Sequence, residues 1–265
     1  MKLLVPLTLL ALLAAPAVPA AAEMTAREIM QAVDDRDDGD LSVRDMEMIL
    51  IDKNGNQRVR KIRSWSRDDG EDIHTILFFL EPADVEDTGF LTYDYDLEKD
   101  DDQWLYLPAL HKTKRIASSD KSGSFMGSDF SYADMTKREV DRYDWTLMEE
   151  EVEVRGHPCW QIQGIPNTQE EIDETGYTKT ISFVRKDNFV VVRSISWVEK
   201  GGRLKYMDVP KLEKIDGIWV PTEIHMTTKK GKKTLHRTIL HTTNVRFGED
   251  LDAEFFSVRR LEKGL

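Results

Sequence analysis

The sequence contains a single cysteine, Cys159, among 265 residues. One thiol excludes an intramolecular disulfide, and no cysteine stands near the N-terminus, where an acylated lipoprotein would need one. Cys159 lies in a mostly apolar stretch, residues 157–162. We therefore predict that its side chain is buried and unreactive rather than a nucleophile.

Long apolar runs are also missing: after residue 22 no segment approaches the roughly 20 apolar residues that a membrane-spanning helix requires. The first stretch carries Lys2, then a short apolar run over residues 3–13, then small residues ending in Ala20-Ala21-Ala22. This order is typical of a secretory signal peptide with an A-x-A cleavage site. We expect cleavage after Ala22, which leaves residues 23–265 as one soluble periplasmic domain.

Basic residues are fewer than acidic ones: the sequence has 37 Lys and Arg and 49 Asp and Glu, which gives a net charge of −12. This balance argues against nucleic acid as a partner and against unaided docking on anionic lipid headgroups.

The motifs of most enzyme classes are absent. The sequence has no H-E-x-x-H, and no glycine-rich loop opens a helix. The stretch from Gly123 to Gly127 places its serine one position too early for a nucleophile elbow. We therefore expect no catalytic residues, no metal and no cofactor. A hydrolase with a dispersed active site would require a polar cluster in a pocket, such as a histidine with a carboxylate and a serine.

The body of the chain has the pattern of strands and turns. Short turn signals such as Asn54-Gly55-Asn56 and Asp216-Gly217 separate segments in which apolar and polar residues alternate. About a dozen strands between residues 41 and 246 predict an antiparallel meander, more than an open sheet usually carries without curling. Residues 76–80 and 189–192 are apolar on both faces, so helices are expected to cover the second face there.

Helices are expected at a few places only. Residues 25–33 are predicted to form a helix with an apolar stripe, with Thr25 at the N-cap and Glu28 in capping-box position. A second helix is predicted over residues 131–139, and short helical turns near residues 168–174 and 252–255.

The most distinctive segment begins with Trp104-Leu-Tyr-Leu-Pro, continues with Arg115-Ile116, and ends with the run GSFMGSDFSYAD from Gly123 to Asp134. It resembles the outer-membrane lipoprotein-sorting protein family, the LolA-like group often encoded near RND-type (MMPL) exporters. The likeness covers essentially all of residues 23–265. It implies a mainly β (α+β) fold, an unclosed antiparallel half-barrel whose concave apolar face is covered by helices.

The resemblance also implies a function. It points to a non-enzymatic periplasmic binding protein that carries or accepts a lipid, lipoprotein or other hydrophobic cargo, with an RND-type exporter of the inner membrane as partner. The alternative is an envelope sensor or protein-interaction module that uses the same fold without transporting cargo.

Residues 123–134 are predicted to form a mobile cover, because they carry apolar side chains between two glycines that permit bending. Asp129 is expected to cap the following helix, and Asp134 to pair with Arg115. Large aromatics most often serve as core, so a permanent plug that binds nothing stays open as the alternative. The candidate ligand-binding residues are Phe78, Trp104, Tyr106, Phe125, Met126, Phe130 and Tyr132.

Overall fold

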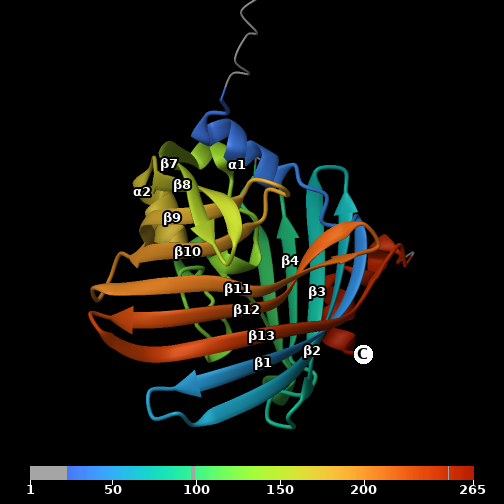
Figure 1. The fold of residues 1–265 in the computed structure, drawn as a ribbon. Coiled ribbons are helices and arrows are strands. Elements are labelled where there is room, and N and C mark those ends of the chain that lie inside the picture. Colours follow the sequence, from blue (N-terminus) through green and yellow to red (C-terminus); the bar gives the residue numbers. More distant parts are fainter. Residues whose placement is uncertain (1–22, 97–98, 250) are drawn as a thin grey trace, which may run out of the picture.

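The computed structural model describes residues 23–96, 99–249 and 251–265. In this part of the chain thirteen antiparallel strands form one sheet, which curls without closing into a barrel (Figure 1). The prediction of a mainly β half-barrel is therefore confirmed. The predicted signal peptide, residues 1–22, and its cleavage site lie outside the described residues.

The sheet consists of two meanders that meet where β1 pairs with β13. β1 and β13 are far apart in the sequence, whereas every other pair of neighbouring strands is consecutive in the chain. The first meander contains β1 (Leu41–Asp52), β2 (Gln57–Asp69), β3 (Asp72–Glu81), β4 (Gly89–Asp94), β5 (Asp102–Leu107) and β6 (Lys112–Arg115). The second contains β7 (Tyr143–Val154), β8 (His157–Pro166), β9 (Tyr177–Arg185), β10 (Val191–Val198), β11 (Arg203–Ile215), β12 (Ile218–Lys230) and β13 (Lys233–Phe247).

Short hairpins join most of these strands, as the turn signals predict. Asp216 and Gly217 connect β11 to β12 with φ values of +50° and +93°. Positive φ at both central residues is the geometry whose twist matches that of the flanking strands, and glycine adopts it without steric cost.

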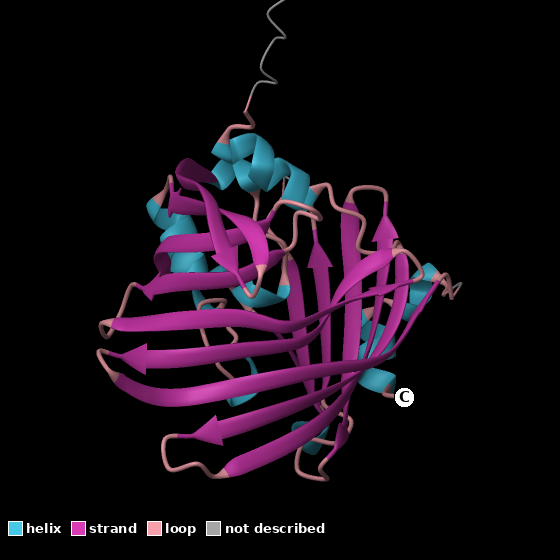
Figure 2. Cartoon of the chain, viewed as in Figure 1, coloured by secondary structure: helices cyan, strands magenta, loops and turns pink. Residues whose placement is uncertain are grey.

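Helices lie at the ends and outside of the sheet (Figure 2). Helix α1 (Ala26–Asp34) begins with the predicted capping box: Thr25 donates its backbone N–H to Glu28 over 2.7 Å, and Glu28 donates back to the Thr25 hydroxyl over 3.3 Å. The predicted turns near residues 168–174 and 252–255 appear as α2 (Gln169–Thr175) and the 3-10 turn η6 (Ala253–Phe255). Helix α3 (Val258–Lys263) was not predicted.

The predicted helix over residues 131–139 is wrong. That stretch contains only the 3-10 turn η4 (Ala133–Met135), and the backbone is already extended at Thr136. The Asp134 carboxylate accepts the Ser131 backbone N–H over 2.7 Å, and the Ser131 hydroxyl accepts the Asp134 N–H over 3.3 Å. These local side-chain bonds satisfy the backbone in a tight turn and compete with helix formation.

The sheet has an apolar core on each of its faces in the first meander. On β3, Leu77 and Phe79 belong to the inner core, whereas Ile76 and Phe78 belong to the outer core with Phe256 and Leu261 of the C-terminal segment. The C-terminal segment thus covers the second apolar face of residues 76–80, as the sequence requires. The alternation of side chains along a strand separates the two sets.

The structure also describes the surroundings of the single cysteine and the length of the helices. Cys159 is fully buried, and burial raises the pKa of its thiol, as expected of an unreactive side chain. Within the described residues, no helix is long and apolar enough to cross a bilayer.

Candidate functional site

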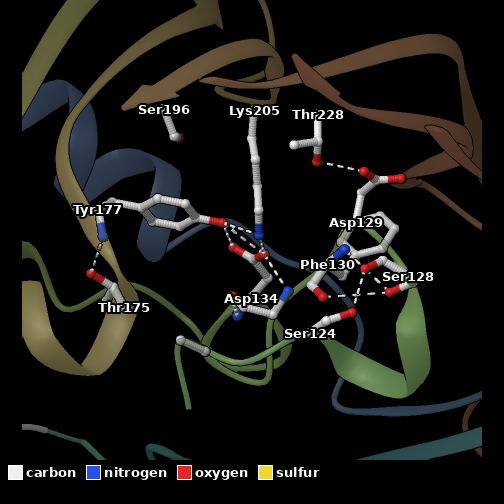
Figure 3. Close-up of polar contacts among 12 residues, drawn as sticks. Ser124, Ser128, Asp129, Phe130, Asp134, Thr175, Tyr177, Ser196, Lys205 and Thr228 are labelled. Carbon is white, nitrogen blue, oxygen red and sulfur yellow. Dashed lines mark hydrogen bonds and ion pairs between the residues drawn. The ribbon is translucent and has the colours of Figure 1, made fainter. Parts of the chain in front are cut away.

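Residues 116–142, which we call the strap, connect β6 to β7, the two edge strands of the sheet. The strap therefore has to pass from one edge of the open half-barrel to the other. It contacts the inner face through polar groups of strands from both meanders, several of which Figure 3 shows. The predicted cover, residues 123–134, is the central part of this strap.

Aromatic side chains of the strap pack into the inner core. Phe125 is only 1% exposed, and its ring centroid lies 5.0 Å from that of Phe90, 5.6 Å from Tyr132 and 6.2 Å from Phe79. Phe130 is buried in the same cluster. Offset and edge-on contacts at these distances stabilise a packed aromatic group beyond the burial of its area.

Asp129 attaches the strap to the second meander, and its carboxylate is almost completely buried. It accepts hydrogen bonds from Thr228 on β12 over 2.5 Å and from Thr238 on β13 over 2.8 Å. A ring nitrogen of His236, Nδ1, lies 2.6 Å from the second carboxylate oxygen. We call these four residues the Asp129 latch. The prediction that Asp129 caps a helix is wrong, because no helix follows and its partners lie far along the chain.

Asp134 makes a second polar attachment (Figure 3). Its carboxylate accepts from the Tyr177 hydroxyl over 2.9 Å, and Lys205 donates to that hydroxyl over 2.9 Å. Burial raises the pKa of Tyr177 further above its already high ordinary value, which keeps the phenol protonated and able to donate. The predicted pair of Asp134 with Arg115 is wrong, because the Arg115 Nε donates to Asp102 over 2.8 Å.

Side chains of the first meander also donate hydrogen bonds to backbone carbonyl groups of the strap. The Arg60 guanidinium on β2 donates to the Met126 carbonyl over 2.5 Å, and the Gln103 amide on β5 donates to the Tyr132 carbonyl over 2.9 Å. Met126 has a φ of +49°, which L-residues rarely adopt. A non-glycine residue persists in this conformation only where its surroundings hold it, so the Arg60 contact stabilises a strained part of the strap.

Beside the strap, the inner face of the second meander encloses a cavity of about 450 Å³. This volume falls within the range of roughly 300–1,000 Å³ found for small-molecule sites. Apolar side chains from helix α1, the strap and strands β10 to β12 line it: Met30, Val33, Phe130, Val140, Val191, Met207, Ile224 and Met226. Eleven charged side chains, among them Asp134, Glu139 and Glu171, line it as well.

The structure divides the seven predicted ligand-binding residues between the two faces of the sheet. Phe125, Met126, Phe130 and Tyr132 come together on the inner face, and of the seven only Phe130 lines the cavity. Phe78 is fully buried on the outer face, with Trp104 and Tyr106 packed against the same outer core. The sequence analysis did not single out Met207, Ile224 and Met226 as site residues, although the alternation in β12 already placed Ile224 and Met226 on one face.

A second cavity of about 460 Å³ adjoins the first and is strongly acidic. Ten carboxylate side chains and two basic side chains line it. Burial, reinforced by the charge of Asp101, raises the pKa of Asp94 to about 8. Burial likewise raises the pKa of Glu139 to about 7 and that of Asp68 to about 6. Crowded carboxylates with limited access to water hold their protons more tightly.

These raised pKa values make stability depend on pH. Each group binds its proton more tightly in the folded chain, so its contribution is complete below pH 4 and is lost as the pH rises toward 8. We expect Asp94→Asn, which mimics the protonated acid, to change the free energy of unfolding little at pH 4. At pH 8 Asp94→Asn should increase the free energy of unfolding by several kcal/mol, up to about 5 kcal/mol. Urea unfolding of both proteins across this pH range measures the difference.

The control for this prediction is Asp96→Asn, which removes an exposed carboxylate from the same cavity. It should leave the pH dependence close to that of the unaltered chain. Equal pH profiles for the two variants would contradict the raised pKa of Asp94.

Comparison with known proteins places this architecture in a family. A family profile described as an uncharacterized protein matches residues 71–263. A DUF1329 family protein from Desulfovibrio piger is 30% identical with a TM-score of 0.80, and the match covers 89% of this chain and 97% of that one. A structure described as an outer membrane lipoprotein-sorting protein domain, from Vibrio parahaemolyticus, is 31% identical with a TM-score of 0.80 and covers 89% and 98%.

A LolA superfamily protein from Nitrosomonas europaea is 16% identical, with a TM-score of 0.66 over 90% of this chain and all of that one. At this identity the likeness concerns the fold. Among curated proteins, none matches the sequence. The identities of 30% and 31% over 89% of this chain, together with the shared half-barrel, confirm the resemblance seen in the sequence. The chain belongs to the DUF1329 family and has the fold of the LolA superfamily.

Proposed function

We propose that this protein binds apolar cargo in the cavity beside its strap and carries it, or accepts it, in the bacterial cell envelope without catalysis. The observation that carries the proposal is a cavity of about 450 Å³ whose wall contains a group of apolar side chains from helix α1, the strap and strands β10 to β12. The relative from Vibrio parahaemolyticus is described as a lipoprotein-sorting protein domain, which supports a lipid or lipoprotein acyl chain as the cargo.

The energetics of acyl chains favour such a site. Burying one methylene group is worth about 0.8 kcal/mol, so a sixteen-carbon chain requires roughly 12 kcal/mol of apolar burial to leave a membrane. Three methionines, Met30, Met207 and Met226, line the cavity. Their flexible thioether side chains adapt to irregular apolar ligands and allow release as well as binding.

Within this proposal the residues Phe125, Met126, Phe130 and Tyr132 form the cover that the cargo displaces or contacts. Phe130 is the best placed of them because it belongs both to the strap and to the cavity wall. For Phe78, Trp104 and Tyr106, contact with a ligand stays a prediction. Their packing against the C-terminal segment on the outer face favours a role in holding helix α3.

The proposed place of action is the periplasm, after cleavage behind Ala22, as one domain of residues 23–265. The leader pattern in the first 22 residues supports export. An RND-type exporter of the inner membrane is the partner that the family resemblance suggests.

Native mass spectrometry of the protein purified from the periplasm, with organic extraction of the bound material, tests this function. We expect a retained long-chain lipid or acylated peptide and a protein mass that begins at Glu23. Phe130→Asp should remove most of the bound mass because a carboxylate in the cavity wall is costly to bury. Leu110→Asp is the matched control, since Leu110 is 61% exposed and outside the cavity.

A cavity-filling variant, Met207→Trp, guards against misfolding of the aspartate variant. It should fold, as judged by circular dichroism, and bind less cargo. If the protein is reproducibly empty, and stays empty when it is offered lipids or lipoprotein, the carrier proposal fails. A stable protein complex that survives Met207→Trp would then favour the sensor or interaction module.

A further inference from the structure

Three hairpin tips lie side by side at one end of the sheet, on the left of Figure 1: β1–β2, β12–β13 and β10–β11. The strand register places them together. Asp52 at the end of β1 pairs with His236 on β13, and Lys229 near the end of β12 pairs with Leu204 on β11. Residues 52–61, 199–205 and 229–237 therefore form one continuous edge, which we call the basic rim.

The basic rim carries twelve Lys and Arg residues and only two acidic residues, in a chain whose net charge is −12. Nine of the twelve are exposed: Lys53, Arg58, Lys61, Lys200, Arg203, Lys230, Lys232, Lys233 and Arg237. Two of the nine have a carboxylate partner, Lys61 with Glu81 and Lys200 with Glu199. The pair Lys230 and Lys233 faces across the turn between β12 and β13. Like charges at this spacing repel one another, so the rim attracts anions rather than stabilising the hairpins.

The opposite end of the sheet has the opposite charge. The acidic cavity lies there, between helix α1, the start of β1 and the β2–β3 turn, with ten carboxylate side chains in its wall. Basic and acidic side chains are therefore concentrated at opposite ends of the sheet, a separation that the net charge of −12 does not reveal. In the field of a negatively charged surface such a molecule turns its basic end toward that surface.

We propose that the basic rim docks this protein on the anionic headgroups of a phospholipid membrane. Most of its exposed cations are lysines on separate, protruding tips, which suit a fluid layer of many phosphates better than one shaped protein epitope. Lysine binds as a mobile point charge, whereas a carboxylate or phosphate in a fixed pocket is usually recognised by the planar fork of arginine. Val59, 42% exposed on the same rim, adds an apolar group to the docking surface.

Docking by this surface would bring the latched end of the strap to the membrane. Thr228 and His236, two partners of Asp129 in the latch, are direct neighbours in sequence of Lys229 and Arg237 on the rim. The docking proposal goes beyond the proposed function, since binding to headgroups does not require that the cavity hold cargo.

Vesicle flotation with the mature full chain tests the proposal. The probes are phosphatidylcholine vesicles with and without 40% phosphatidylglycerol, at low ionic strength and in 0.5 M NaCl, where the Debye length falls to a few ångströms. We expect binding only to the anionic vesicles and only at low salt. Replacing Lys230, Lys232 and Lys233 by glutamate should weaken this binding at least tenfold.

The matched control reverses three exposed lysines outside the rim, Lys112, Lys211 and Lys263, and changes the net charge equally. It should bind within about threefold of the unaltered chain, since the field near a surface acts on the nearest charges. Absence of binding to anionic vesicles, or an equal loss in both variants, would overturn the proposal. So would salt-sensitive self-association without vesicles that the rim variant abolishes, because the rim would then bind the acidic pole of a second copy.

Discussion

Asp129→Ala is expected to lower the free energy of unfolding by about 4 kcal/mol and to release the centre of the strap from the sheet. The Asp129 side chain is 1% exposed, accepts hydrogen bonds from Thr228 and Thr238, and lies within hydrogen-bond distance of His236. Removing one member of a buried, hydrogen-bonded charge network costs roughly 3–5 kcal/mol, because the remaining polar groups lose their partners without regaining water.

Hydrogen exchange measured by mass spectrometry distinguishes release of the strap from general destabilisation. Peptides that cover residues 123–134 should lose protection first, while peptides from β1 and β2 keep theirs under native conditions. Asp120→Ala is the matched control within the strap, since Asp120 is half exposed and its one ion-pair partner among the described residues is Lys114. Such a surface pair is worth about 1 kcal/mol at most. Unchanged protection of the strap in Asp129→Ala would show that the aromatic cluster alone holds it.

Phe125→Ala is expected to lower the free energy of unfolding by about 4 kcal/mol. Phe125 is 1% exposed and contacts the rings of Phe79, Phe90 and Tyr132, so truncation removes both apolar burial and aromatic packing. Phe→Ala substitutions in cores typically cost 3–5 kcal/mol, because the surroundings collapse only partly into the space left behind. Equilibrium unfolding in urea measures the loss.

The same substitution also separates a cover from a structural plug. Phe256→Ala, on the outer face and also 1% exposed, is the control for stability. If the strap covers a ligand site, Phe125→Ala should change the amount or chain length of bound lipid, whereas Phe256→Ala should not. Equal ligand content in both variants would indicate that the aromatics of the strap fill the inner face permanently and contact no cargo.

Sequence reasoning succeeded where the deciding interactions are local. The Thr25 and Glu28 capping box spans three residues, and both of its hydrogen bonds are present. It failed over residues 131–139, where a helix was expected. There the Ser131 and Asp134 side chains close a turn, and Asp134 is then bound by Tyr177 and Lys205 from distant strands.

The candidate site was harder to predict than the fold, for the same reason. Alternation in the sequence assigns Phe78 and Phe79 to opposite faces, but it does not say which face is concave. The C-terminal segment packs against Phe78, and the strap packs near Phe79. Only these long-range contacts separate an outer core from an inner one, so the sequence analysis placed residues of both faces in one site.

The sequence by itself predicted the meander of strands, the first helix and the family to which the chain belongs, and the structure and the comparisons confirm them. Export, expected from the leader, stays a prediction. Each of these depends on composition or on residues a few positions apart. Tertiary structure decided where the strap is latched, since the donors to Asp129 lie about a hundred residues away along the chain. It also decided the distribution of charge, because only the pairing of β1 with β13 brings the three basic tips together at one end of an acidic protein.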